Sequence, residues 1–161
     1  MRELKKSDMT DKDIKRFWSK AEKIGECLVW KSAKVKSKNL EYVYFHFNGA
    51  AVRANRFAYA IAHGECPTNL QIDHICHNTL CVNPDHLQAV TRRENCENLS
   101  GAHRDSKTGI RGVSFHTQRK KWVVTVRGKY YGLFSDIHEA EKRAIEVRDL
   151  LMTNNLEDRK R

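Results

Sequence analysis

Three potential metal ligands recur at even spacing in the middle of the chain: Cys76, Cys81 and His86 are each five residues apart. Two thiolates and an imidazole this close in sequence can converge on one tetrahedral zinc ion. A fourth ligand must come from elsewhere, either from Cys27 at the start of a predicted strand or from Cys66, and we favour Cys27. Four protein ligands would make this a structural site with one zinc ion per chain, because a catalytic zinc needs an open coordination position.

His74 lies two residues before Cys76 on a predicted strand and is poorly placed to bind the same ion. Asp73 beside it and Asn95 further along carry hard oxygen donors, which suit Mg²⁺ or Mn²⁺ as a catalytic cation. Phosphodiester hydrolysis needs a neutral imidazole to take a proton from water and a cation to neutralise the phosphate and the leaving 3′ oxygen. An isolated Asp-His pair is more often structural, so the assignment of these three catalytic candidates depends on their combined spacing.

Short elements of mixed type must position these side chains. The capping pattern that begins at Thr10 predicts a helix with Ala21 on its apolar face and an end near Gly25. Alternating residues around an Asn-Gly pair predict a hairpin over 42–53, and apolar residues at helical spacing predict a helix over 55–63.

The candidate site itself falls on a further run of elements. A strand is predicted over 70–75, followed by a long loop, a second strand and a helix from Thr91 to about Leu99. The metal-ligand motif would then occupy the loop, and Asn95 the helix.

Composition narrows the possible functions. The chain has 161 residues, a net charge of +10 and a pI of about 9.5, which suits one ordinary domain or two small ones and excludes a large multidomain enzyme. The basic excess favours a polyanionic partner, nucleic acid above all. No apolar run could span a bilayer and the first ten residues are polar, so we expect a cytoplasmic protein with no membrane partner. In a reducing compartment, five cysteines favour free thiols and a metal site over disulfides.

A polar stretch over 100–109 without apolar periodicity predicts a linker. We therefore predict a first domain over 1–103, a second over 104–154 and a polar tail over 155–161. The second domain should contain three strands and a helix capped at Asp136. The predicted strands cover residues 110–115, 122–127 and 129–134.

Basic and aromatic side chains gather on this predicted sheet. A two- or three-stranded sheet can enter the major groove of DNA, where arginine pairs with guanine edges and lysine with phosphates. The candidate DNA-binding residues are Arg111, Arg119, Lys121, Trp122, Arg127, Lys129 and Tyr131, with Lys120 and Tyr130 beside them. Arg53 and Arg56, which precede the metal-ligand motif, are further candidates for phosphate contacts, with ordinary surface arginines as the alternative.

Residues 27–95 resemble the HNH, or ββα-metal, nucleases, and most closely the phage HNH group and the related His-Cys box homing endonucleases. The matching signature is Asp73-His74, Cys76, Cys81, Asn83-Pro84-Asp85-His86-Leu87, Thr91 and Glu94-Asn95. The resemblance implies that His74 is the general base and that Asn95 and Asp73 bind the catalytic cation. It assigns the structural zinc to Cys76, Cys81 and His86, with an upstream cysteine that matches Cys27.

The chain departs from these families at two points. Many HNH enzymes have an asparagine in place of His86, and that asparagine orients the base. Here His86 or a neighbouring backbone carbonyl must take that task. The His-Cys box proteins also have a second zinc site nearer the C-terminus, and because no cysteine follows Cys96 a second zinc ion is not expected.

Residues 106–152 resemble the Apetala or ethylene-response-factor DNA-binding domain. The matching elements are Gly109-Ile110-Arg111-Gly112-Val113-Ser114-Phe115, Lys121-Trp122, Tyr131-Gly132-Leu133-Phe134 and Glu139-Ala140. The resemblance implies that a three-stranded sheet reads double-stranded DNA while a helix packs behind it. The fusion of such a domain to an HNH nuclease is similar to free-standing phage homing endonucleases.

We therefore expect an α+β protein in which a zinc-stapled ββα-metal nuclease domain precedes a small three-stranded antiparallel sheet with one helix. The predicted function is site-directed, metal-dependent cleavage of double-stranded DNA by a homing endonuclease, acting as a monomer in the cytoplasm of a bacterial host if phage-encoded. A DNA-binding regulator with a degenerate nuclease fold, or a restriction or repair nuclease, is the alternative.

Overall fold

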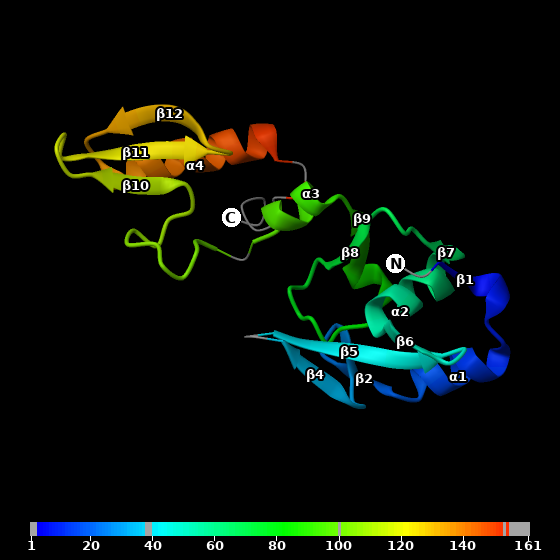
Figure 1. Cartoon of the computed structure of the whole chain (residues 1–161). Coiled ribbons are helices and arrows are strands. Elements are labelled where there is room, and N and C mark those ends of the chain that lie inside the picture. Colours follow the sequence, from blue (N-terminus) through cyan, green and yellow to red (C-terminus); the bar gives the residue numbers. More distant parts are fainter. Residues whose placement is uncertain (1–2, 38–39, 100, 153, 155–161) are drawn as a thin grey trace. The chain divides into compact units, whose positions relative to one another are not determined.

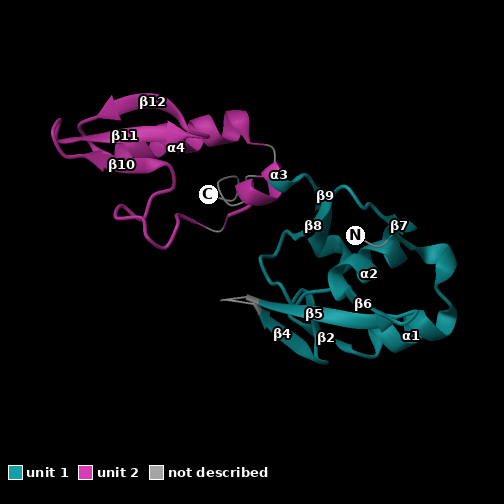
Figure 2. Ribbon diagram, in the orientation of Figure 1, with its two compact units in different colours: residues 1–92 teal, residues 93–161 magenta. Residues whose placement is uncertain are grey.

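The chain divides into two units, Met1–Arg92 and Arg93–Arg161 (Figures 1 and 2). The computed structural model describes residues 3–37, 40–99, 101–152 and 154. Four α-helices and several small antiparallel sheets make up these described residues, in agreement with the predicted α+β class. None of the helices within them has the length and apolar character needed to cross a membrane.

Unit 1 is built from small sheets in which every pairing is antiparallel: β1 with β7, β2 with β3, β4 with β5 and β6, and β8 with β9. Its elements are β1 (Leu4–Lys5), the 3-10 helix η1 (Lys6–Asp8), α1 (Asp11–Trp18), β2 (Ala21–Ile24), β3 (Cys27–Trp30), β4 (Lys34–Ser37), β5 (Leu40–Phe47), β6 (Ala50–Arg53), α2 (Ala54–His63), β7 (Glu65–Cys66), β8 (Gln71–His74), the 3-10 helix η2 (Pro84–His86) and β9 (Leu87–Val90).

An aromatic cluster forms the centre of unit 1. Phe17, Trp30, Phe45 and Phe57 come from α1, β3, β5 and α2, and each is at most 1% exposed. The ring centroid of Phe17 lies 5.0 Å from those of Trp30 and Phe57 and 5.2 Å from that of Phe45. Buried aromatic rings carry much of the packing energy of a core. Because Trp30 ends β3, this cluster also fixes the strand that begins at Cys27.

The predicted hairpin and the helix after it are confirmed. Asn48 and Gly49 both have positive φ, 48° and 74°, as the tight turn between β5 and β6 requires. Helix α2 begins at Ala54 and ends at His63, immediately before Gly64. Its Asn55 side chain donates to the Ile72 carbonyl at 3.1 Å, which ties α2 to β8.

The first predicted helix is shorter than expected. Thr10 and Asp13 form the predicted capping box, but α1 ends at Trp18. The expectation that Ala21 continues this helix was wrong, because Ala21 begins β2 and pairs with Trp30 of β3. Gly25, with φ of 58°, belongs to the turn of this β2–β3 hairpin and does not end a helix.

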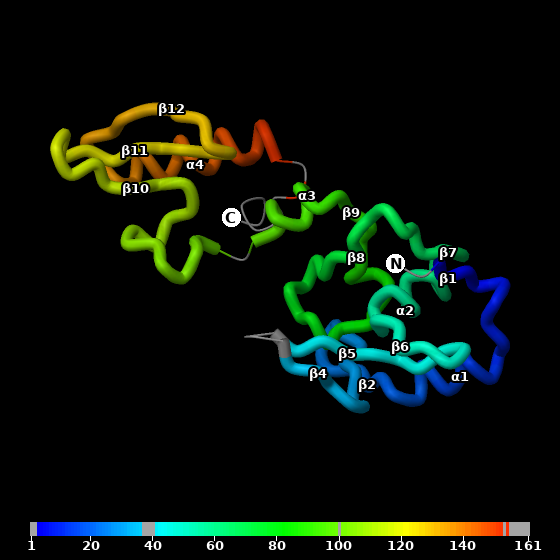
Figure 3. The backbone as a smooth tube through the Cα atoms, in the orientation of Figure 1, coloured from blue at the N-terminus to red at the C-terminus, as the bar shows by residue number. Residues whose placement is uncertain are grey.

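The order of strand, long loop, strand and helix predicted around the metal-ligand motif is confirmed. Strand β8 pairs with β9, and residues 75–86 form the connection between them, which can be followed in Figure 3. Helix α3 (Arg92–Glu97) comes directly after β9. The strand-strand-helix order is therefore the one that a ββα-metal module has.

Unit 2 consists of a three-stranded antiparallel sheet with one long helix packed against it (Figure 1). After α3 its elements are β10 (Val113–His116), β11 (Lys121–Val126), β12 (Lys129–Phe134) and α4 (Ile137–Leu151). Asp136 caps α4 by accepting the backbone N–H groups of His138 and Glu139. The buried side chains between sheet and helix are Val113, Val124, Val126, Ala140, Ala144, Val147 and Met152.

The division between the units falls after Arg92, whereas the sequence placed it near residue 103 in the polar stretch. The difference arises because α3 bonds to the rest of unit 2. Asn154 donates from its side-chain amide to the Glu94 carbonyl at 3.0 Å, and the carboxylate of Glu97 pairs with Arg127. These contacts join residues far apart in sequence and give no local signal.

Candidate functional site

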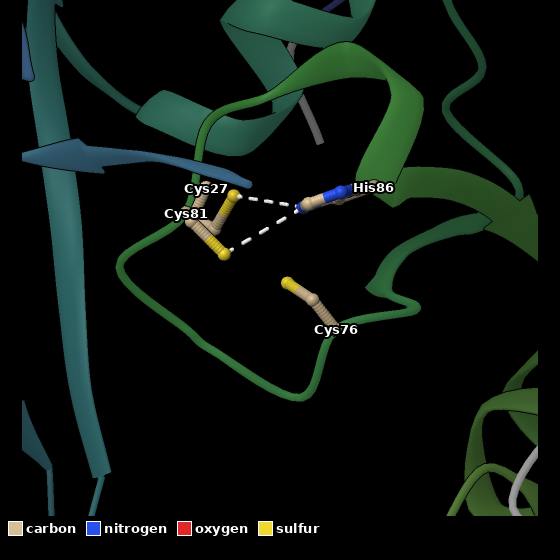
Figure 4. Close-up of side chains that lie close together, drawn as sticks. All are labelled: Cys27, Cys76, Cys81 and His86. Atoms are coloured by element: carbon tan, nitrogen blue, oxygen red, sulfur yellow. Dashed lines mark hydrogen bonds between the residues drawn. The ribbon is translucent and has the colours of Figure 1, made fainter. Parts of the chain in front are cut away.

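Four side chains converge beside β3: Cys27, Cys76, Cys81 and His86 (Figure 4). Cys27 is the first residue of β3, Cys76 and Cys81 lie in the connection between β8 and β9, and His86 ends η2. Their three sulfur atoms and one imidazole nitrogen all lie within 4.8 Å of one another. The structure thus brings together the predicted metal ligands and selects Cys27 over Cys66, which is buried in β7 outside the cluster.

The spacing of the ligand atoms fits a single tetrahedral ion. The Nδ1 atom of His86 lies 3.6 Å from the Sγ atoms of both Cys27 and Cys81. With a metal–sulfur distance of about 2.3 Å and a metal–nitrogen distance of about 2.0 Å, tetrahedral geometry separates sulfur and nitrogen by about 3.5 Å. Three thiols and an imidazole can therefore hold one metal ion with little movement, and this donor set suits zinc.

Backbone hydrogen bonds hold the loop against β3. The Trp30 amide donates to the Leu80 carbonyl at 2.9 Å and the Val82 amide to the Leu28 carbonyl at 2.7 Å, on either side of a bridge between Val29 and Cys81. These bonds bring Cys81 next to the strand that carries Cys27. The aromatic core packs against the same strand through Trp30, so the cluster is attached to the buried core of unit 1.

The cluster thiols are costly to ionise without a cation. Burial raises the pKa of Cys81 to about 12, and burial likewise raises the pKa of Cys76. A metal ion binds the thiolate form, so its positive charge would offset this cost and displace the protons. Cys66, outside the cluster, has its pKa raised to about 11 by burial and lies opposite Leu4 in the β1–β7 pair.

Asp73 and His74 form the end of β8, as predicted. Oδ1 of Asp73 accepts the His74 backbone N–H at 2.8 Å, and Oδ2 accepts the side-chain amide of Gln88 at 3.1 Å. Gln88 lies directly opposite Asp73 in the β8–β9 register. Sequence reasoning missed Gln88, because the register of the two strands determines which residue faces Asp73.

The surroundings of His74 favour the neutral imidazole. Burial lowers the pKa of His74, while the Asp73 carboxylate and a hydrogen bond with the Cys81 backbone act in the opposite direction. A backbone group that raises a histidine pKa accepts a hydrogen bond, so this contact is of the kind expected to orient His74, and that role stays a prediction. The positive charge of Arg53 further lowers this pKa, which places Arg53 near the imidazole.

Asn95 lies on α3 and belongs to unit 2, whereas Asp73 and His74 belong to unit 1. Its amide oxygen and the Asp73 carboxylate are both hard donors, the type that Mg²⁺ and Mn²⁺ prefer. The cation site shared by Asp73 and Asn95 stays a prediction.

Arg53 and Arg56, the two arginines near the motif, differ in their exposure to solvent. Arg53 is exposed, and its guanidinium carbon lies 4.5 Å from the ring centroid of Tyr42, a stacking contact that orients the side chain. Arg56 is only 6% exposed and donates to the carbonyls of Pro67 at 2.6 Å and Leu70 at 3.2 Å. The expected phosphate contact of Arg56 is therefore contradicted by its burial, and Arg53 alone of the two can reach DNA.

We expect Arg53→Ala to weaken DNA binding and Arg56→Ala to destabilise the fold. Loss of one phosphate contact at Arg53 should lower the slope of log K for DNA against log salt by about 0.9 and leave the melting temperature unchanged. Loss of the charged hydrogen bonds of Arg56 should lower the free energy of unfolding by about 1.5 to 3 kcal/mol. Salt titrations of DNA binding, together with thermal melts of both variants, check this; an unchanged salt slope in Arg53→Ala would contradict the phosphate contact.

On the sheet of unit 2 the predicted DNA-binding residues do not share one face. Trp122 and Tyr131 pack against the α4-facing core, and the Trp122 ring lies 4.7 Å from that of Phe115. Alternation along β11 turns Trp122 toward the helix and Lys121 away from it, while the DNA contacts of the half-buried Trp122 and Tyr131 stay predictions. Tyr130, 63% exposed, and Phe115, 48% exposed, are aromatic side chains that the sheet presents to solvent.

The basic residues predicted to contact DNA also differ in their exposure and in their protein partners. Arg119, Lys121 and Lys129 are exposed, as a DNA contact requires. Arg111 is half-buried, with its guanidinium 3.6 Å from the sulfur of Met152. Arg127 forms an ion pair with Glu97, so its guanidinium already has a protein partner, and its DNA contact stays a prediction.

Comparison with known proteins agrees with this site. Residues 52–96 match the family model of the HNH endonucleases, a stretch that runs from β6 through Asp73, His74 and three of the clustered ligands to α3. The chain is also 33% identical over 82 residues to protein 7.7 of Escherichia phage T7, an alignment that covers 51% of this chain and 61% of that protein. The chain thus spans less than two thirds of that relative. No solved structure matches the chain.

Proposed function

We propose that the protein is a site-directed DNA endonuclease that hydrolyses phosphodiester bonds with His74 as general base. The observation that carries the proposal is the end of β8, where a half-buried histidine adjoins an acidic residue inside the segment that matches the HNH endonucleases. We further propose homing as the biological role, with restriction or repair as the alternative.

His74 is suited to accept a proton from a water molecule that attacks the phosphorus. Burial favours its neutral form, and the hydrogen bond with the Cys81 backbone fixes the orientation of the ring. Asp73, held by the His74 amide and Gln88, and Asn95 on α3 would bind Mg²⁺ or Mn²⁺. When bound, such a cation supplies positive charge for the phosphate and for the leaving 3′ oxygen.

The cluster of Cys27, Cys76, Cys81 and His86 is proposed to hold one structural zinc ion. All four positions around the ion would be filled by protein, so this site has no place for water or substrate. Its task would be to fix the loop from which the Cys81 backbone reaches His74. The two metals would then have separate roles, zinc in folding and magnesium or manganese in catalysis.

Double-stranded DNA is the proposed partner, bound by a single copy of the chain. Arg53 would contact the backbone near the scissile phosphate, and unit 2 would supply a second contact through Arg119, Lys121 and Lys129. The net charge of +10 supports a sequence-independent share of this affinity. Cleavage would take place in the cytoplasm of a bacterial host if the chain is phage-encoded.

The test is incubation of the purified, zinc-loaded protein with supercoiled plasmid in buffer free of Mg²⁺ and with Mg²⁺ or Mn²⁺ added. We expect nicked or linear product only when the cation is added, and loss of product when Mg²⁺ is removed while zinc stays bound. Binding of the plasmid without cleavage under every cation would reject the nuclease and favour a DNA-binding regulator.

A further inference from the structure

Helix α3, which carries Asn95, is short and buries no apolar side chain that could fix its position. It spans six residues, Arg92–Glu97, and isolated helices shorter than about 12 residues are marginal in water. Its one buried residue is the charged Glu97, 4% exposed, while Cys96 is exposed. No apolar side chain of this helix is buried, so its position depends on polar contacts.

Glu97 supplies the strongest of these contacts. Its Oε1 atom accepts from Nη2 of Arg127 and also pairs with Nε of Arg93 at 3.5 Å. The Glu97 side chain is 6% exposed and that of Arg127 25%, whereas that of Arg93 is 68% exposed. A buried carboxylate needs a charged partner that is itself shielded from water, and Arg127 fits this requirement better than Arg93.

Arg127 lies in the tight turn between two strands of the sheet. It forms the turn between β11 and β12 with Gly128, and both residues have positive φ, 51° and 75°. Asn-Gly or Asp-Gly is the usual choice for such a turn, and a long side chain in the first position is uncommon. From this turn the guanidinium of Arg127 reaches the carboxylate of Glu97.

A second contact, from a residue that follows α4 in the chain, holds the same helix. The side chain of Asn154 donates to the Glu94 carbonyl at 3.0 Å. On α3 itself, side chains two positions apart leave the axis in directions about 200° apart. A helix anchored through Glu97 therefore presents Asn95 on a different face, away from the anchoring carboxylate.

We propose that Glu97 and Arg127 are positioning residues: the second unit anchors α3 through this ion pair and so sets the position of Asn95. This inference rests on the proposed function, in which Asn95 binds the catalytic cation. The unit proposed to bind DNA would then also hold a ligand of the cleavage site. Arg127 would act on catalysis through Glu97, not on DNA.

The variants that separate these roles are Arg127→Ala, Arg127→Lys, Glu97→Gln and the double variant Arg127→Ala/Glu97→Gln in the full, zinc-loaded chain. Arg143→Ala is the matched control, because Arg143 forms an exposed ion pair with Glu146 on α4 and carries the same charge. The measurements are turnover on saturating DNA, the Mg²⁺ concentration for half activity, the salt dependence of DNA binding and amide hydrogen exchange over residues 93–98.

An anchoring role predicts that Arg127→Ala and Glu97→Gln share one defect. Half activity should require about 10- to 100-fold more Mg²⁺, as for the loss of an outer-shell partner of a metal ligand. The double variant should be no worse than either single variant, Arg127→Lys should restore part of the activity, and exchange over α3 should accelerate. DNA affinity and its salt slope should stay close to those of the unchanged protein and of Arg143→Ala.

A DNA contact by Arg127 predicts the reverse pattern. Arg127→Ala would then weaken binding and flatten the salt slope with normal turnover on saturating DNA, and Glu97→Gln would leave the Mg²⁺ requirement unchanged; this result overturns the inference. If the unchanged protein never cleaves DNA, the proposed function fails. In that case hydrogen exchange decides alone: unchanged exchange over α3 in Arg127→Ala overturns the anchor, and faster exchange supports it.

Discussion

The variant His74→Ala should cut DNA about 10² to 10⁴ times more slowly than the unchanged protein, because a positioned general base contributes a factor of this size. Its affinity for DNA should be nearly unchanged. The proposed phosphate contacts lie on Arg53 and on the exposed basic residues of unit 2, and a neutral imidazole adds no charge to the bound state. Rates of plasmid nicking at saturating enzyme, with binding to the same DNA measured without cation, separate the two quantities.

A matched control for this variant is His46→Ala, which removes an exposed histidine from β5 of the same unit. His46→Ala should cut DNA at the unchanged rate. Zinc content and melting temperature of His74→Ala should also match those of the unchanged protein, so that slow cleavage cannot be attributed to a damaged fold. Cleavage by His74→Ala at the unchanged rate would remove His74 from the mechanism.

Local patterns predicted much of the fold. The Asn48-Gly49 pair defines a hairpin because both residues accept positive φ, and the capping box at Thr10 begins α1 because its bonds lie within one turn. The metal cluster was predictable for a related reason. Three of its ligands are spaced evenly within one loop, so their convergence on one ion can be inferred from local sequence. The fourth ligand, Cys27, begins a predicted strand, and this position favoured it over Cys66.

Features that depend on distant pairing were not predictable from sequence. Apolar periodicity suggested that α1 continues through Ala21, but the pairing of Ala21 with Trp30 overrides it. Arg56 resembles any surface arginine until the Pro67 and Leu70 carbonyls are seen to surround it. A charged side chain can be assigned to DNA or to the protein only when the partners around it are known.

The predicted domain boundary near residue 103 also depended on local composition and took no account of contacts between distant residues. Low apolar content did indicate a connecting segment, and the described residues 98–99 and 101–112 lie in neither a helix nor a strand. The helix before that segment nevertheless belongs to unit 2 through Glu97 and Arg127. A fragment that ends at residue 103 would retain α3 but lose both Arg127 and Asn154, so composition alone would divide the molecule at a point that separates α3 from its anchors.

The variant Cys81→Ser should lose its zinc and with it the fold of the loop between β8 and β9. Cys81 is fully buried, is one of four proposed ligands, and makes the backbone contact that is proposed to orient His74. Structural zinc ions bind with apparent free energies of about 10 to 16 kcal/mol, which equals or exceeds the stability of a typical domain of about 5 to 15 kcal/mol. Elemental analysis should fall from about one zinc per chain to almost none, with a large drop in melting temperature.

Three further serine variants make this test specific to the cluster. Cys27→Ser should also lose zinc, because Cys27 is the proposed fourth ligand. Cys96→Ser removes an exposed thiol outside the cluster and should retain both zinc and stability. Cys66→Ser places a hydroxyl in the core and should lower the melting temperature while the folded protein keeps its zinc, since Cys66 lies in β7 away from the ligands. A folded Cys81→Ser protein with one zinc ion per chain, or a Cys66→Ser protein without zinc, would show that the ion is held elsewhere.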